Sequence, residues 1–138
     1  MAKQDLIVLA LNEPPVTDLM ERALRASEFE VVIVRDRAGL DRSIQEAIPA
    51  LMIIGEKFSE ESGLAVSASI LERFPTMPIL LFAVKDAPGL ARDVLKSGLS
   101  GYLSAPLKID DIIEEVKRTL HRARNLGDWV RREVKRTT

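Results

Sequence analysis

Few side chains capable of chemistry gather in this sequence, and they follow runs of apolar residues. The charged and amide residues singled out after the ends of such runs are Asn12, Glu13, Glu56, Lys57 and Lys85. Carboxylate and amide oxygens are the ligands that Mg²⁺ prefers. No glycine-rich phosphate loop of the G-x-G-x-x-G or Walker type follows a run, so the sequence gives little support for a nucleotide-binding enzyme.

Length and composition indicate one ordinary domain. The chain has 138 residues, of which 46% are hydrophobic and 30% charged, and it has no cysteine. A domain of this length buries roughly 65–70% of the surface of its unfolded chain, so it needs no disulfide or metal to fold. The absence of cysteine excludes zinc-thiolate sites and cysteine nucleophiles. Because every apolar run is far shorter than the ~20 residues of a membrane span, we expect a cytoplasmic protein.

The apolar runs alternate with helical patterns, and this alternation predicts the fold class. The runs occupy residues 6–11, 31–34, 50–54, 79–84 and 101–103. Most are continuously apolar, as expected for strands of a parallel sheet that is covered on both faces. Apolar residues spaced three and four apart fill the intervals. We therefore predict an α/β protein, a doubly wound (βα)5 sandwich of three layers.

The last helix has a different apolar spacing. Steps of four and three residues alternate along Ile109, Ile113, Val116, Leu120, Ala123, Gly127, Val130 and Val134. This spacing is typical of a heptad seam, so we expect a domain over 1–122 and a projecting C-terminal helical linker extension over 123–138. On this hypothesis Leu120, Ala123, Val130 and Val134 bury apolar surface only in a dimer. The alternative is that Gly127 ends the helix.

The same segment is strongly basic. Residues 117–138 hold eight bases and two acids, whereas the rest of the chain is acidic and the whole has a net charge of -1. Such a tail can contact nucleic acid or anionic lipid. A solvated helix is the favoured interpretation, because the bases lack interleaved aromatic residues and a DNA-reading motif. We expect no direct nucleic-acid binding.

Three motifs give the chain a family resemblance. They are Gly55-x7-Gly63-Leu64, Pro78-Ile-Leu-Leu-Phe-Ala83 and Ser97-Gly-Leu-Ser-Gly-Tyr102-Leu-Ser-Ala-Pro106. With them, residues 4–124 resemble the receiver domain of bacterial response regulators. The resemblance implies a flavodoxin-like sheet with strand order 2-1-3-4-5. It also implies phosphoryl transfer to an aspartate, with Mg²⁺, a hydroxyl residue and a lysine beside it.

The residues at the positions of that chemistry depart from the family pattern. The degenerate phosphoacceptor pocket comprises Leu11, Asn12, Glu13, Gly55, Ala83 and Ala105. Gly55 stands at the position of the phosphoacceptor, and Leu11 and Asn12 at those of the paired acids. Ala83 replaces the hydroxyl residue and Ala105 the lysine. The pocket therefore lacks the attacking oxygen and the groups that offset phosphoryl charge, and we expect no catalytic residue, no metal and no cofactor. Ser62 is expected to cap a helix rather than to accept phosphate.

The resemblance also assigns an interaction surface. Tyr102 stands at the family's aromatic switch, and the alternative is a half-buried tyrosine that packs over Ala83 or anchors the preceding helix. Pro106 matches a family proline that follows a cis bond. Ala91, Leu95 and Arg118 are expected to be exposed near it.

We therefore predict a non-catalytic, phosphorylation-independent interaction or dimerisation module of a two-component signalling protein. Its partner would be another protein or a second copy, bound through the helix around 90–95, the strand at 101–103 and the last helix. The C-terminal helix offers a second dimer contact. An output or transmitter domain is expected beyond Thr138. The alternative is a small-molecule or nucleotide-binding domain on the same fold.

Overall fold

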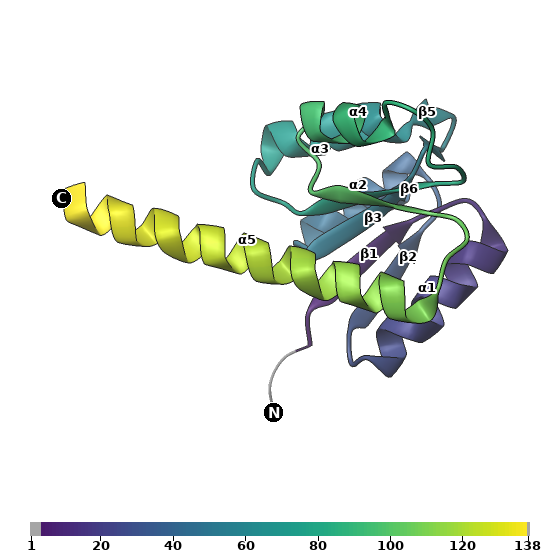
Figure 1. Ribbon diagram of the computed structural model, residues 1–138, viewed down its shortest axis with the longest axis horizontal. Helices are drawn as coiled ribbons and strands as arrows, with labels where there is room; N and C mark the ends of the chain where they lie inside the picture. The colour runs from purple at the N-terminus through teal and green to yellow at the C-terminus, as the bar shows by residue number, and fades with distance from the viewer. Residues whose placement is uncertain (1–3, 138) are drawn as a thin grey trace.

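Five parallel strands form the centre of the molecule. The computed structural model describes the backbone of residues 4–137 and the side chains of residues 4–125. The strands are β1 (Leu6–Ala10), β2 (Glu30–Val34), β3 (Leu51–Gly55), β6 (Ile79–Ala83) and β7 (Gly101–Ser104). They lie in the order β2-β1-β3-β6-β7 (Figure 1). Counted along this sheet alone, the order is 2-1-3-4-5, so the predicted topology is confirmed.

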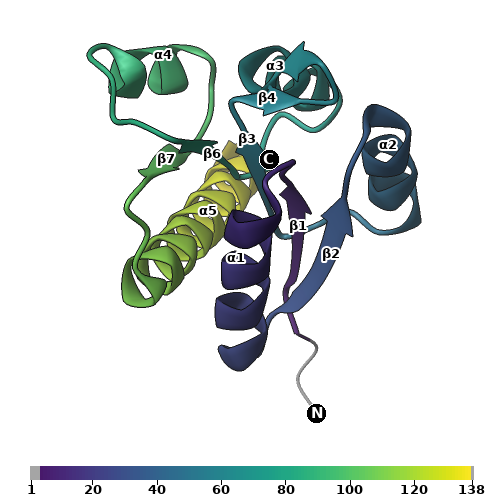
Figure 2. The same cartoon turned by 90° about the vertical axis from the view of Figure 1, so that its right-hand side faces the viewer.

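Helices cover both faces of the sheet. They are α1 (Pro14–Ala26), α2 (Arg37–Glu46), α3 (Gly63–Arg73), α4 (Leu90–Lys96) and α5 (Ile109–Thr137). Figure 2 shows α1 and α5 on one face and α2, α3 and α4 on the other. The predicted three-layer sandwich is thereby confirmed. Along the described residues, no helix is both long and apolar enough to cross a membrane.

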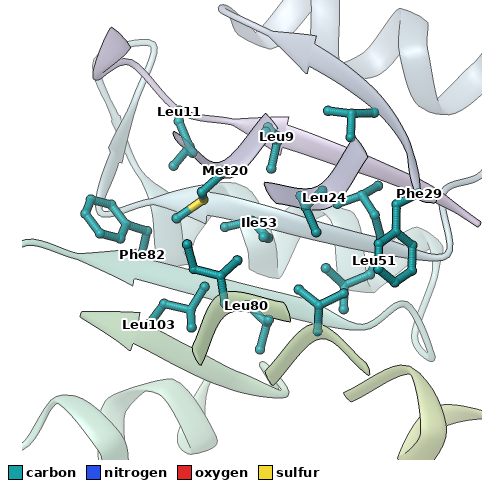
Figure 3. Packing of buried hydrophobic residues seen from close by; sticks show 14 of the residues in the cluster. Leu9, Leu11, Met20, Leu24, Phe29, Leu51, Ile53, Leu80, Phe82 and Leu103 are labelled. Atoms are coloured by element: carbon teal, nitrogen blue, oxygen red, sulfur yellow. The ribbon is translucent and has the colours of Figure 1, made fainter. Parts of the chain in front are cut away.

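Alternate residues of each strand pack into two separate hydrophobic cores, one on each face of the sheet. Ile7 and Leu9 of β1 pack with Met20 of α1 in the first core, part of which is drawn in Figure 3. Val8 and Ala10 of the same strand belong to the second core, under α2, α3 and α4. Because successive side chains of a strand point to opposite faces, a sheet covered on both sides needs apolar residues at every position. This requirement explains the continuous apolar runs.

The last helix differs from its sequence-based interpretation in two ways. It continues through Gly127 to Thr137, so a helix end at Gly127 is wrong. Leu120 is only 5% exposed and belongs to the first core with Ile112 and Val116, so its assignment to a dimer contact is also wrong. Some of the residues at heptad spacing, such as Val116 and Leu120, are buried against the sheet. Ile109, the first residue of that spacing, is instead 51% exposed.

The far half of α5 extends away from the sheet (Figure 1). The Arg124 guanidinium bonds to the Asp5 carboxylate, which ties the helix to the start of β1. The side chains of Val130 and Val134 lie outside the described residues. A seam in this half, and the division of the chain at residue 122, therefore stay predictions.

A short hairpin interrupts the connection from β3 to α3 and was not predicted. It pairs β4 (Lys57–Phe58) with β5 (Glu61–Ser62) in antiparallel fashion. The Phe58 side chain is fully buried in the second core. The Ser62 hydroxyl accepts a hydrogen bond from the Ala65 N–H at 3.4 Å, so the expected helix cap is confirmed. The hairpin fixes the loop that follows β3.

Candidate functional site

A cavity of about 320 Å³ opens at the carboxyl edge of the sheet. Parallel strands end together at this edge, where α/β proteins bind their ligands. The lining residues are Leu11, Asn12, Glu13, Gly55, Glu56, Lys57, Phe82 and Val84. Four of the six residues of the predicted degenerate pocket, Leu11, Asn12, Glu13 and Gly55, are therefore brought together.

The two remaining residues of that pocket do not line the cavity. Ala83 is fully buried and forms the last residue of β6. Ala105 is exposed beyond the end of β7, and its N–H donates to the Ala83 carbonyl at 3.3 Å. Neither residue presents a polar side chain to the cavity.

Space for a side chain exists at Gly55 even though no side chain is present. A Cβ built there would lie 3.4 Å from the Lys57 carbonyl oxygen and 3.6 Å from Leu11 Cδ2, which are ordinary contacts. Gly55 is therefore compatible with a larger residue. Its effect on the site is chemical, since it removes any nucleophile from the end of β3.

The donor set does not fit the magnesium ion that the family resemblance implies. Mg²⁺ takes oxygen ligands in near-octahedral array, usually from carboxylates, whereas Gly55 and Leu11 offer no side-chain oxygen. Within the described part of the chain, no group of three His, Cys, Asp or Glu residues is placed to hold a metal ion. No step through a metal follows from these residues.

Glu56 connects the two sides of this cavity. Its N–H donates to the Phe82 carbonyl at 3.2 Å, and its own carbonyl accepts from the Gly63 N–H at 2.7 Å. Its carboxylate Oε1 accepts from the Val84 N–H at 3.2 Å. Glu56 is a predicted charge near a strand end, but its hydrogen bond to Val84 was not predicted because Val84 lies 28 positions away.

The predicted interaction residues divide between two neighbouring surfaces. Tyr102, Pro106 and Arg118 line a cavity of about 240 Å³ between β7 and α5. Ala91 and Leu95 are exposed on α4, where the Leu95 side chain is 69% exposed. The Ala105–Pro106 peptide bond is cis, as the resemblance implies. Arg118 is held by Glu114 and Glu115 of its own helix, at 2.7 and 3.1 Å.

Tyr102 joins β7 to the loop before α4. Its ring is half-buried against the second core, and its hydroxyl donates to Asp86 Oδ1 at 3.1 Å. The hydrogen bond to this carboxylate raises the pKa of the Tyr102 phenol, and desolvation adds to the rise. Asp86 was missed by the sequence analysis. An acid just past a strand end and before Pro88-Gly89 was the one available signal.

Comparison with known proteins establishes the family. The model of the response regulator receiver domain matches residues 7–117. The chain therefore belongs to the response regulator receiver domain family, and the resemblance found in its sequence is confirmed.

Curated relatives and solved structures agree with this assignment. Over 91 residues the chain is 28% identical to the transcriptional regulatory protein DegU of Brevibacillus brevis, covering 65% of this chain and 39% of that protein. Over 120 residues it is 23% identical to the probable transcriptional regulatory protein TcrX of Mycobacterium tuberculosis, covering 86% of this chain and 51% of the relative. The chain thus spans about half the length of these relatives or less.

Among solved structures, a CheY-like receiver domain protein of Methanospirillum hungatei has a TM-score of 0.81 at 17% identity, covering 91% of this chain and all of that one. NtrX of Brucella abortus has a TM-score of 0.84 at 21% identity, covering 96% of this chain and 29% of NtrX. At these identities the likeness shows the fold.

Proposed function

We propose that this receiver domain signals without being phosphorylated. The observation that carries the proposal is Gly55, which ends β3 beside the carboxyl-edge cavity and supplies no oxygen to attack a phosphoryl donor. Ala83 and Ala105 add no polar side chain there. Phosphoryl transfer depends on a placed nucleophile and on stabilisation of charge, so we propose a domain with no enzymatic activity. The cytoplasmic location expected from the sequence is part of this proposal.

The proposed activity is protein–protein interaction. The α4–β7–α5 surface, defined by Ala91, Leu95, Tyr102, Pro106 and Arg118, supports it because it presents the 69% exposed Leu95 beside charged residues. Ala91 and Leu95 stand four residues apart on α4 and therefore share one face of the helix, and contiguous apolar patches rimmed by polar residues are typical of binding surfaces. The partner would be a second copy of the chain or another signalling protein, with an output or transmitter domain as the effector.

A phosphorylation assay tests the first part of this proposal. Incubation with acetyl phosphate, or with beryllofluoride and Mg²⁺, should leave the mass, the melting temperature and the oligomeric state unchanged. The variant Gly55→Asp should fold, because its Cβ has room, and should still respond weakly or not at all without a hydroxyl at 83 and a lysine at 105. A stoichiometric phosphoryl adduct on the unmodified domain would overturn the proposal.

Matched surface variants test the second part. Leu95 and Ile48 are 69% and 64% exposed, and Ile48 lies just after α2 rather than on the proposed surface. Leu95→Asp should abolish self-association or partner capture, whereas Ile48→Asp should leave it unchanged, with sedimentation velocity as the measurement. For the second dimer contact, Val130→Asp tests the projecting half of α5. Because the basic segment repels its copy, dimers formed there should tighten as salt rises.

A small-molecule site at the carboxyl edge is the second candidate. The cavity of about 320 Å³ supports it, since small-ligand pockets begin near this volume. A thermal-shift screen distinguishes the two functions, because a ligand at 100 times its Kd stabilises a protein by about 2.7 kcal/mol. An interaction module without such a site should show no response.

A further inference from the structure

We propose that Glu56 is a latch, whose carboxylate holds the β6–α4 loop (residues 84–89) and thereby sets the position in which α4 and Tyr102 are presented. The inference rests on the proposed interaction surface for its functional meaning. Its structural content stands on the hydrogen bonds of Glu56 and Tyr102 alone.

The backbone of Glu56 is fixed on both sides. Its N–H bonds to Phe82 of β6 at 3.2 Å, and its carbonyl bonds to Gly63 at the start of α3 at 2.7 Å. The carboxylate therefore starts from a defined place at the end of β3. From there Oε1 reaches the Val84 N–H at 3.2 Å, one residue past the end of β6.

The hairpin next to Glu56 makes this end of the contact rigid. Phe58, two residues further on, is fully buried in the second core. Glu61 on the second strand of the hairpin pairs with Arg37 of α2 at 3.8 Å. These two contacts hold the hairpin that begins directly after Glu56, so the backbone from which the exposed Glu56 side chain starts is held in place.

The donor of this hydrogen bond, the Val84 N–H, belongs to an exposed loop. Residues 84–89 are all exposed, and none belongs to a helix or strand. Segments with few buried contacts open locally at low free-energy cost. Because the Val84 amide has passed the last ladder position of β6, the Glu56 carboxylate supplies the partner that the sheet does not.

The β6–α4 loop connects Glu56 to the proposed α4–β7–α5 surface through two further contacts. Asp86, two residues after Val84, accepts the Tyr102 hydroxyl at 3.1 Å. Helix α4 begins at Leu90, directly after Gly89, whose φ is 84°. A loop released at Val84 therefore loosens both the Asp86–Tyr102 bond and the start of α4. Since the carboxylate is part of the chain, this arrangement needs no modification to form.

Variants at Glu56 test the latch in the whole chain. Glu56→Ala removes the acceptor, Glu56→Gln keeps an oxygen but loses the charge, and Glu13→Ala is the control. Glu13 lines the same cavity, and no side-chain hydrogen bond of Glu13 occurs among the described residues. The measurements are amide hydrogen exchange by NMR, with Val84 as the reporter and Ile53 as the core reference, and the pKa of Tyr102.

The expected result is local. Exchange at Val84 should rise about fivefold or more in Glu56→Ala, less in Glu56→Gln, and not at all in Glu13→Ala, because a bond to a charged acceptor outweighs one to a neutral amide. The pKa of Tyr102 should fall in Glu56→Ala as its bond to Asp86 loosens. Exchange at Ile53 should stay unchanged.

Unchanged exchange at Val84 in Glu56→Ala would overturn the proposal. So would equal acceleration at Val84 and Ile53 in both Glu56 variants, which would show general destabilisation. These outcomes are independent of the phosphorylation and Leu95 assays. The latch and the proposed function therefore fail separately.

Discussion

The carbonyl oxygen of Gly55 lies 1.9 Å from the point that a Cβ on Gly63 would occupy. Both residues are buried, and Gly63 is the first residue of α3. Real Cβ atoms do not approach a backbone oxygen so closely, so α3 meets the end of β3 only because residue 63 has no side chain. In the motif Gly55-x7-Gly63-Leu64, the second glycine is therefore required by the close packing of α3 against β3.

Gly63→Ala should destabilise the fold by about 2 kcal/mol or more, because the methyl group must push α3 away from β3. Urea unfolding followed by circular dichroism measures this loss. Gly55→Ala is the matched control and should cost far less, since its Cβ would find 3.4 Å to the nearest atom. Equal losses in the two variants would contradict the packing argument.

Tyr102 should titrate above the ordinary tyrosine pKa of about 10, because its hydroxyl donates to the Asp86 carboxylate. It is the chain's one tyrosine, so ultraviolet absorbance of tyrosinate reports it directly. A raised folded-state pKa means that the bond stabilises the fold fully below pH ~10 and that this contribution is lost as the pH rises through the folded-state value.

Asp86→Asn should lower the pKa of Tyr102 toward its ordinary value, since the carboxylate charge is removed. Asp93→Asn, an exposed acid on α4, should leave it unchanged. A wild-type pKa at or below the ordinary value would show that the Tyr102–Asp86 bond does not form in solution.

The hairpin turn at Ser59 and Glu60 should accept a stabilising replacement. Both residues have positive φ, 52° and 66°, in a two-residue turn that favours Asn-Gly. The double variant Ser59→Asn, Glu60→Gly should raise the free energy of unfolding by about 1 kcal/mol. Lys57→Gly, at an extended position of the same hairpin, should instead lower it. A loss of stability in the double variant would contradict the turn geometry.

Leu120→Ala should cost about 2–4 kcal/mol of stability, because Leu120 is 5% exposed in the first core. Lys117→Ala, at an exposed position of the same helix, should cost little. Chemical unfolding at several protein concentrations measures both. If Leu120→Ala altered self-association and left monomer stability intact, the dimer contact assigned from the heptad spacing would be restored.

The strands and most helices were predictable from the sequence, because a sheet that is buried on both faces requires continuous apolar runs. Runs such as residues 50–54 have no polar position, and β3 is fully buried. The β4–β5 hairpin has no such run. Its turn is Ser59-Glu60 rather than Asn-Gly, and its strands are two residues long.

The error in α5 has a physical origin. Heptad spacing of 3.5 residues and helical spacing of 3.6 coincide over a few turns, so Val116 and Leu120 fit both patterns. Ile112, fully buried in the first core, fits the second one only. The choice between a dimer seam and a core stripe required the position of the sheet.

The hydrogen bonds of the candidate site were not predicted from the sequence. The loss of chemistry at Gly55 and Ala83 follows from the positions that the family resemblance assigns to them, and it stays a prediction. The bond from Val84 to Glu56 spans 28 positions and that from Tyr102 to Asp86 spans 16. The predicted strand order places these strand ends beside one another, but it does not specify the path of the loop or the side-chain rotamers that form the two bonds.

The continuous helix α5 connects the core of the domain to the far end of the helix. Val116 and Leu120 pack in the first core, and the backbone from there to Thr137 forms one uninterrupted helix. An α-helix turns about 100° and advances about 1.5 Å per residue. If the residues that pack on the sheet shifted along α5 by one position, the far end of the helix would rotate by roughly a quarter turn. A small change of packing at the sheet would therefore reorient the projecting half of α5.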